Sequence, residues 1–400
     1  MSNNLNYINE LFHLSDLQEI FLSFLLNSNY QSFKYVLTGV NYPTKLPDWS
    51  CNKKYDKFDV LNLFSGDNLF VFDLKTVYEM LVGTSCNKID VCLALDNQAV
   101  SYLKGIFTAK PSNIPLDKQQ YIELLLREDV TYDYTPYVWE NMKKISDEKI
   151  SFNVLETIKA CERFKSMDVE IYKKNGEIRY TKNEDEIEQL SIGMYQLMEQ
   201  GNQNERMSSF WKRQEASYLL LLKAVIINFS SNRNARHKFE ELFNFVNDDL
   251  GVVLEREMVI CYHFFNRDHL VDKFFKRIQT TNKDLIKDIY GMSWDLFHIR
   301  HMEFMMGKQL LEEARYTVFS LLTFDRGMAE CIEVCPIRKY IISEEKLYPL
   351  FEYGIRNILS EKDFDNMYMY NIKKRQNIVG KSNYNILKLQ LENEIKSFLV

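Results

Sequence analysis

A buried strand that ends in an acid and leads directly into a helix places the tightest constraint on the fold of this chain. Residues 91–95 are apolar and partly β-branched, which predicts a buried strand, and Asp96 follows at its end. From residue 99 onward the apolar residues suit a helix. In open α/β sheets, ligands bind beyond the carboxyl ends of parallel strands, so Asp96 stands at a natural position for a site. The alternative is that Asp96 only caps the helix.

Three more acids lie on or at the ends of predicted elements. Glu140 falls one turn inside a helix that Thr135 caps and Pro136 begins. Asp295 lies on a later predicted helix, and Asp325 follows a second buried strand. Parallel strands that end side by side can bring such groups together although they are far apart in the sequence.

The chemistry of these four side chains favours a hard cation. Clustered carboxylates repel one another unless a cation neutralises them. A ligand set of oxygen atoms, with no thiolate or paired imidazole, suits Mg²⁺ or Mn²⁺ and not zinc. Such a metal lowers the pKa of bound water and stabilises charge on a phosphoryl oxygen, which is the chemistry of phosphodiester hydrolysis. The proposed ligands are Asp96, Glu140, Asp295 and Asp325.

In this order, the four segments resemble the motifs of PIN-domain ribonucleases. The motifs that carry the resemblance are Asp96-Asn97-Gln98 followed by an apolar pair and Ser101-Tyr102-Leu103, then Thr135-Pro136 with Glu140, then Ser293-Trp294-Asp295, and finally Leu322-Thr323-Phe324-Asp325. The resemblance covers roughly residues 88–145 and 285–345. Asn97-Gln98 replaces the usual Thr-Asn, and the interval between Glu140 and Asp295 is longer than in compact family members.

The resemblance implies a helix-rich α/β fold with a PIN-like parallel-sheet core and a large all-helical insertion. The expected divisions are an N-terminal extension (helix, strand, helix) at 1–86, a first PIN-like core segment at 87–148, the insertion at 149–284, and a second PIN-like core segment with a C-terminal helical tail at 285–400. The four acids would be catalytic residues as well as metal ligands, supported by Thr323, Asn97 and Ser101. The implied function is a metal-dependent endoribonuclease, with toxin and defence effectors among the family's roles.

Two alternatives remain open. In the first, the PIN-like site is catalytically degenerate and the helical middle binds a partner protein. An exposed apolar patch on helices between residues 185 and 265 would favour that function. In the second, the acids are helix caps and the chain is a mainly helical binding protein.

Charge decides where a nucleic acid can bind. The net charge of −6 and the pI near 5.7 give no global attraction to RNA, so binding needs a local basic patch. Possible phosphate contacts are Arg233, Arg236 and Lys238, and two further basic clusters lie at 273–277 and 373–375. Each cluster has the alternative of a solvated helix face.

A cytoplasmic location without membrane contact is expected. The seven cysteines are scattered and contain no Cys-x-x-Cys pair, which favours free thiols in a reducing compartment. The polar N-terminus lacks the basic region of a signal peptide, and the longest apolar stretch, 218–229, is too short for a bilayer span. RNA is the expected substrate, and an inhibitor or partner protein and a homo-oligomer remain open.

Several local expectations can be tested against the structure. A helix over 15–27 should be capped by Ser15, residues 28–68 should be largely loop, and a strand at 69–72 should end in Asp73. Asp73 should cap a helix, and it is the rival for the role of first acid. Asn175-Gly176 predicts a two-residue β-hairpin.

The helix that carries Asp295 holds three more titratable residues. His298 and His301 lie three residues apart, and with Asp295 they could form a metal-binding face. The alternative is that both histidines are solvated or core-edge groups. Glu303 is either an extra acid of the site or a surface partner for a base.

Overall fold

The structure is a computed structural model. It describes residues 2–39, 42–84, 88–109, 113–202, 205–307, 314–343, 346–379 and 383–399. Two five-stranded sheets and a larger set of helices make a helix-rich α/β fold. None of the described helices is long and apolar enough to span a bilayer.

The central sheet has the strand order β3-β4-β8-β6-β7. Its strands are β3 (Lys53–Lys54), β4 (Asp59–Asn62), β6 (Ile89–Leu95), β7 (Thr131–Asp133) and β8 (Tyr316–Thr323). β6 pairs in parallel with β7 on one side and with β8 on the other, whereas β4 runs antiparallel to β8. Every residue of β8 is buried, as expected for a parallel strand covered on both faces.

The chain leaves β6 toward β7 and returns on the other side as β8. The strand order therefore reverses next to β6, and the crevice at such a point is where doubly wound sheets bind ligands. Leu95 lies opposite Leu322, so Asp96 and Asp325 follow the carboxyl ends of two adjacent parallel strands.

The second sheet is antiparallel, with the order β10-β9-β1-β5-β2. Its strands are β1 (Phe33–Thr38), β2 (Thr44–Lys45), β5 (Asn68–Phe72), β9 (Ile337–Ser343) and β10 (Lys346–Phe351). Tyr35 and Leu37 belong to a small core that also includes residues of α1, α2 and α3, whereas Val36 belongs to the main core. This alternation buries both faces of β1. The two sheets are joined where the Ile337 amide donates to the Leu63 carbonyl at 2.7 Å.

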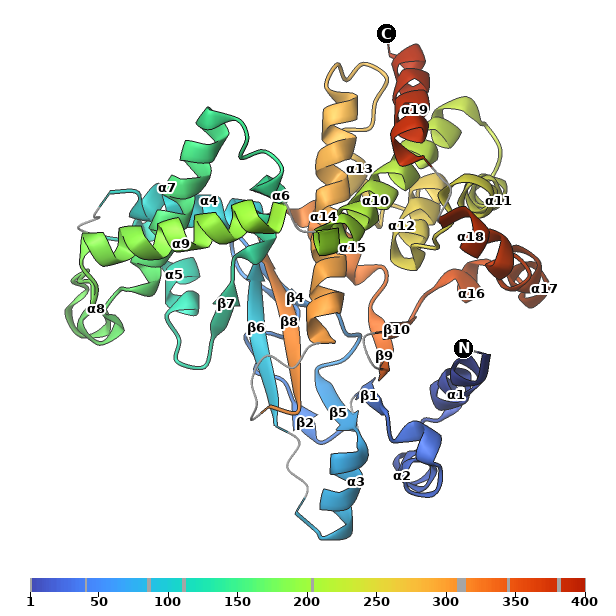
Figure 1. Ribbon diagram of the computed structural model, residues 1–400, viewed down its shortest axis with the longest axis horizontal. Helices are drawn as coiled ribbons and strands as arrows, with labels where there is room; N and C mark the ends of the chain where they lie inside the picture. The colour runs from blue at the N-terminus through green and yellow to red at the C-terminus, as the bar shows by residue number, and fades with distance from the viewer. Residues whose placement is uncertain are drawn as a thin grey trace.

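The helices form two groups around the central sheet, with α14 between them (Figure 1). On the left of the view are α4 (Asn97–Phe107), α5 (Gln119–Leu125), α6 (Thr135–Met142), α7 (Glu148–Lys165), α8 (Val169–Asn175) and α9 (Glu184–Asn202). On the right are α10 (Glu205–Ser230), α11 (Ala235–Phe245), α12 (Glu255–Asn266), α16 (Ile355–Ile358), α17 (Glu361–Phe364), α18 (Ile372–Val379) and α19 (Tyr384–Phe398). Near α14 (Leu285–Met306) lie α13 (Asp272–Phe275) and α15 (Arg326–Glu333), and α1 (Ser2–His13), α2 (Leu17–Leu26) and α3 (Leu74–Leu81) surround the second sheet.

The described residues between 149 and 284 form helices and no strand, apart from an isolated bridge between Met167 and Tyr180. The expected hairpin at Asn175-Gly176 is wrong. Asn175 ends α8, and Gly176 (φ +75°) closes it with an amide hydrogen bond of 2.8 Å to the Tyr172 carbonyl. A helix C-cap and a type I′ turn both need the left-handed conformation that glycine supplies, so the dipeptide did not distinguish them.

The N-terminal segment holds more β-structure than expected. Residues 28–68, expected to be largely loop, contain β1 to β4 and the start of β5, and β4 is fully buried beside β8. These strands have only two to six residues, so local pattern is a weak signal for them. Helix α2 is capped by Asp16 and not by Ser15, because the Asp16 carboxylate accepts from the Gln18 amide at 2.9 Å.

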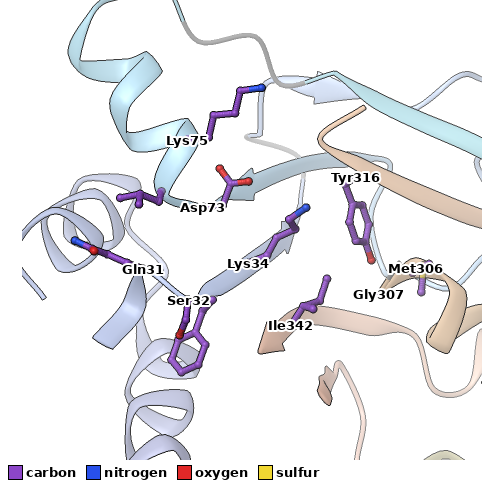
Figure 2. Close-up of a pocket in the computed structure, with 11 residues that line it drawn as sticks. Gln31, Ser32, Lys34, Asp73, Lys75, Met306, Gly307, Tyr316 and Ile342 are labelled. Atoms are coloured by element: carbon purple, nitrogen blue, oxygen red, sulfur yellow. The ribbon is translucent and has the colours of Figure 1, made fainter. Parts of the chain in front are cut away.

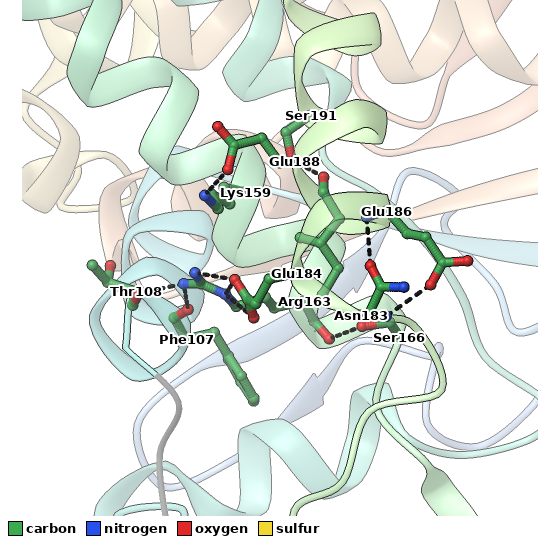
Figure 3. A network of polar contacts seen from close by, with 11 residues as sticks. Phe107, Thr108, Lys159, Arg163, Ser166, Asn183, Glu184, Glu186, Glu188 and Ser191 are labelled. Carbon is green, nitrogen blue, oxygen red and sulfur yellow. Dashed lines mark hydrogen bonds and ion pairs between the residues drawn. The ribbon is translucent and has the colours of Figure 1, made fainter.

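Arg163 of α7 ties three helices of the left-hand group together (Figure 3). Its guanidinium donates to the carbonyls of Phe107 and Thr108 at the end of α4, and it pairs with Glu184 of α9 at 2.8 Å. Lys159 forms a second link, to Glu188 at 2.7 Å. Since α4 begins directly after Asp96, this network fixes the far end of the helix that leaves the strand end.

Arg163→Ala should lower the free energy of unfolding by roughly 1–3 kcal/mol, because two carbonyls and the Glu184 carboxylate lose a charged donor. Lys159→Ala is the matched control, since it breaks a link to a carboxylate that is 56% exposed, and it should cost no more than about 1 kcal/mol. Urea unfolding followed by circular dichroism measures both. Equal losses in the two variants would contradict the role given to Arg163.

Candidate acidic site at the strand ends

Asp96 uses its two carboxylate oxygens differently. It is 3% exposed, and Oδ1 accepts from the Ala99 amide at 2.6 Å, which caps α4. Oδ2 accepts from the Thr323 hydroxyl, at the end of β8, also at 2.6 Å. The cap interpretation is therefore confirmed, and the second oxygen joins Asp96 to the neighbouring strand.

Thr323 links the two acids that follow the strands. Its hydroxyl oxygen accepts from the Asp325 amide at 2.9 Å while its proton goes to Asp96. The Asp325 carboxylate is exposed and accepts from the Gly327 amide at 2.6 Å, which caps α15. The Thr-x-Asp pattern thus fixes the position of both carboxylates.

Glu140 approaches from α6, where Asn97 of α4 donates to it and Lys144 pairs with it at 3.1 Å. Pro136 lies in the first turn, as predicted, but Thr135 is not the cap. Thr135 is the first residue of α6, and its own amide donates to the Asp133 carboxylate at 2.8 Å. The short strand β7 therefore ends in the acid that organises the start of α6.

A cavity of about 300 Å³ brings several of these groups together. One face of α14 borders it with Asp288, Gly291 and Asp295, which lie three and four residues apart. A side chain at Gly291 would meet nothing within 4 Å, so the glycine leaves this region of the cavity open. The full lining is Asn97, Glu140, Lys273, Phe274, Lys276, Arg277, Lys287, Asp288, Gly291, Met292, Asp295 and Asp325. We call it the acidic cleft.

The charges of neighbouring acids affect the two buried members of the predicted set, Asp295 and Asp96. Burial raises the pKa of Asp295 well above its usual range, and the charges of Asp325, Glu140 and Asp96 each raise it further. Burial also raises the pKa of Asp96 to about 6, against the lowering effect of hydrogen bonds from Thr323 and the Ala99 amide. Like charges that disfavour one another's ionisation mark a place where a cation would be stabilised.

Basic side chains form one edge of the acidic cleft: Lys273, Lys276, Arg277 and Lys287. Arg277 pairs with Asp288 at 3.1 Å, and Lys273 lies 3.8 Å from Glu330. Within the described ranges of the chain, Lys276 and Lys287 have no carboxylate partner within 4 Å, and both are exposed. A cleft with carboxylates inside and free ammonium groups at its edge suits a phosphate ester.

The basic edge is held in place by α15. Glu330 accepts from the amides of Lys273 and Phe274 at 2.8 and 3.2 Å, at the start of α13. A Cβ on Gly327 would lie 2.9 Å from the Phe274 Cα, so only glycine allows this approach. The helix that Asp325 caps thus also positions the end of the helical insertion.

The three basic residues predicted as phosphate contacts lie elsewhere, on or just before α11, and none lines the acidic cleft. Arg236 pairs with Glu240 at 2.8 Å and Asp363 at 2.6 Å, and Lys238 is buried with its ammonium 2.9 Å from Asn228 Oδ1. Arg233 is exposed and contacts His237. The 273–277 cluster, which the sequence also marks, borders the cleft instead. Its placement depends on the packing of α13 on α15, which no local pattern reveals.

Other predicted members of the site lie close to it without lining it. The hydroxyl of Ser101 donates to the Asn97 carbonyl at 2.7 Å, within its own helix. His298 is buried with Nε2 3.9 Å from Glu140, and burial lowers its pKa while the Glu140 charge opposes that change. His301 is also buried, with its ring centroid 5.5 Å from that of Trp139, so neither histidine is solvated. Glu303 binds a base, Arg256, at 2.8 Å, but in the interior and not at the surface.

Asp73, the rival first acid, is engaged in structural contacts. Its carboxylate accepts from the Thr76 amide and from Arg315, both at 2.8 Å, and the predicted cap of α3 is confirmed. It borders a separate cavity of about 440 Å³ with Lys34 and Lys75 (Figure 2). No other acid lines that cavity among the described residues. A site of paired carboxylates does not form there.

The acids of the cleft are near one another but not gathered around one point. Across the described ranges, no three His, Cys, Asp or Glu side chains are placed so that they could hold a metal ion. Each carboxylate is held by its own contacts, Glu140 by Asn97 and Lys144 and Asp96 by Thr323 and the Ala99 amide.

Scans against protein-family models, curated proteins and solved structures each find no match to this chain.

The raised carboxyl pKa values predict a stability that falls with pH when no divalent cation is present. Asp96 titrates near 3.8 when unfolded and near 6 when folded, so its contribution is complete below pH 4 and is lost as the pH rises through 6. The loss is on the order of 3 kcal/mol at pH 7. Relative to wild type, Asp96→Asn and Asp295→Asn should therefore gain stability between pH 4 and 7 in urea unfolding with EDTA. Asp147→Asn, which alters the exposed cap of α7, should show no such trend.

Proposed function

We propose that the chain is a metal-dependent ribonuclease whose core is PIN-like. The observation that carries the proposal is the composition of the acidic cleft, where Glu140, Asp295 and Asp325 face a basic edge. Asp96 lies beneath them and contributes its charge. The cleft stands at the carboxyl ends of β6 and β8, at the point where the strand order reverses.

The order of elements supports a PIN-like core. The acids occur at the end of the first parallel strand, on the helix after the second, on the helix before the third, and just after the third. That is the order of the motifs that resemble PIN ribonucleases. Helices α7 to α13 then form an insertion between the second and third acids.

The residues of the cleft fit a divalent cation in two respects. The donor set consists of carboxylate oxygens, and burial together with the charges of three neighbouring acids raises the pKa of Asp295. Mg²⁺ or Mn²⁺ would be held by Asp96, Glu140, Asp295 and Asp325. When bound, the cation would activate water and stabilise charge on a phosphoryl oxygen.

The chain's own groups have separate roles in this reaction. Thr323 keeps one oxygen of Asp96 oriented toward β8 and positions the backbone of Asp325. Asn97 holds Glu140, and Lys276 and Lys287 offer free ammonium groups to the phosphates that flank the scissile bond. The charges suit any phosphodiester backbone, and the resemblance to PIN ribonucleases favours RNA. A role as a toxin or defence effector follows from the same resemblance.

A second candidate function is a protein-interaction module with an inactive site. Two observations favour it: the acids do not surround a common point within the described chain, and α9 exposes Leu190 and Leu197, which lie seven residues apart on one face at 43% and 61% exposure. Phe152 of α7, which packs against α9, is 67% exposed. An inhibitor or partner protein could bind this surface under either function.

Substitution of the acids separates the two functions. Wild type should cleave a single-stranded RNA with Mn²⁺, and Asp96→Asn and Asp325→Asn should reduce cleavage to background, because each loses the charge of a proposed metal ligand. Thr323→Val should reduce the rate by roughly 10–100-fold, as expected when a ligand loses its supporting hydrogen bond. Asp147→Asn should retain full activity. Cleavage that persists in both acid variants, or no Mn²⁺-dependent cleavage by folded wild type, would favour the interaction module.

The basic edge predicts how RNA binding depends on salt. On an Asp96→Asn background with EDTA, Lys276→Glu and Lys287→Glu should weaken binding and lower the slope of log K against log salt by about 0.7 per lost contact to single-stranded RNA. Arg233→Glu should leave both quantities unchanged, since Arg233 lies outside the cleft. Fluorescence anisotropy with a labelled oligonucleotide measures the effect. An equal loss from Arg233→Glu would place the RNA on α11.

A further inference from the structure

A third cavity, of about 950 Å³ and larger than the two described above, lies where α10, α14 and α19 meet the edge strand β10. These elements can be followed in the centre and on the right of Figure 1. Lining residues that matter for its chemistry are Lys212, Arg213 and Glu215 of α10, Arg300, Glu303 and Phe304 of α14, Lys346 of β10, and Tyr384 of α19. It shares no lining residue with the acidic cleft.

The charged groups of this cavity are unbalanced. Glu303 is neutralised by Arg256, whose guanidinium binds it at 2.8 and 3.0 Å, and Arg300 is paired with Glu257. Among the described residues that line the cavity, Lys212, Arg213 and Lys346 then remain, against one acid, Glu215. In a chain of net charge −6, this is a concentrated positive region.

Of these side chains, Arg213 gives the strongest argument for an anionic ligand. It has no ion pair among the described residues, and its guanidinium lies 5.7 Å from the Phe304 ring centroid. Burial lowers the pKa of Arg213, and the charge of Arg300 lowers it further. Arg213 therefore faces the cavity without an anionic partner among the described residues, while Arg300, which is bound to Glu257, adds positive charge nearby. An anionic ligand would stabilise the Arg213 guanidinium.

We propose that this cavity binds a small phosphate-bearing anion of nucleotide size. Arg213 would supply planar donors for phosphate oxygens, which arginine binds in pairs, and Lys212 and Lys346 would add charge. The volume lies within the usual range for small-molecule sites. Phe304 and Tyr384 add aromatic surface beside the charged groups, which suits a base as well as a phosphate chain.

Calorimetric titration with tripolyphosphate and with ATP tests the proposal in about 150 mM salt, where loose surface attraction is screened. Wild type should bind saturably, and Arg213→Glu should weaken binding at least about tenfold through loss of a charged hydrogen bond. Arg233→Glu is the matched control and should bind as wild type does. Equal affinities for the two probes would assign recognition to the phosphate chain, and tighter binding of ATP would add the base.

Two results would overturn the proposal: no binding of either probe at millimolar concentration, or equal binding by wild type and Arg213→Glu. Binding that is lost in Lys276→Glu and kept in Arg213→Glu would move the ligand to the acidic cleft. Arg213→Gln provides a second variant if charge reversal disturbs folding, which circular dichroism would reveal. Since the titrations use no divalent cation and no RNA, they are independent of the proposed ribonuclease activity.

Discussion

The parallel pairing of β6 with β8 is the constraint on which the candidate site depends. It sets Leu95 opposite Leu322, and the residues that follow are then forced to meet. The Thr323 hydroxyl, placed by that register, donates to Asp96 and accepts from the Asp325 amide. A slip of one residue would turn Thr323 to the other face of the sheet and separate the two acids. The burial of all eight β8 residues makes such a slip costly, so packing protects the geometry of the site.

The elements that could be predicted well from the sequence are those defined by a pattern of neighbouring residues. The strand at 91–95 is a continuous apolar run and the strand at 318–322 is apolar apart from Ser320, and their terminal acids stand where the pattern placed them. The edge of the cleft could not be predicted in this way. The 273–277 cluster was recognised as basic, but its position results from two contacts distant in sequence, the Glu330 carboxylate on α13 and the close approach at Gly327. Strand β4 was missed because four residues carry too little periodicity, although its pairing with β8 completes the central sheet.

The buried acids at the cleft lower the free energy of unfolding when they are ionised and no cation is bound. Asp96 and Asp295 are held where burial and neighbouring charges disfavour their ionised forms. A core selected for stability alone would place apolar side chains at such positions. Groups in unfavourable positions persist where the surrounding structure fixes them. Here the parallel strands and the capped helices α4 and α15 fix the acids. This is the reason to treat the cleft as functional even though its carboxylates are not gathered around a single point.

The long interval between Glu140 and Asp295 has a structural consequence for the cleft. The insertion begins beside the site, since α7 follows α6, and it returns to the site through α13, which α15 anchors. Its last residues supply the basic edge, whereas the core supplies the acids. Arg163 fixes the beginning of the insertion to the end of α4, so both ends are tied to helices that start directly after an acid. Under the proposed function, an insertion joined in this way would limit which phosphate-bearing chain enters the cleft, and its sequence would set the substrate preference.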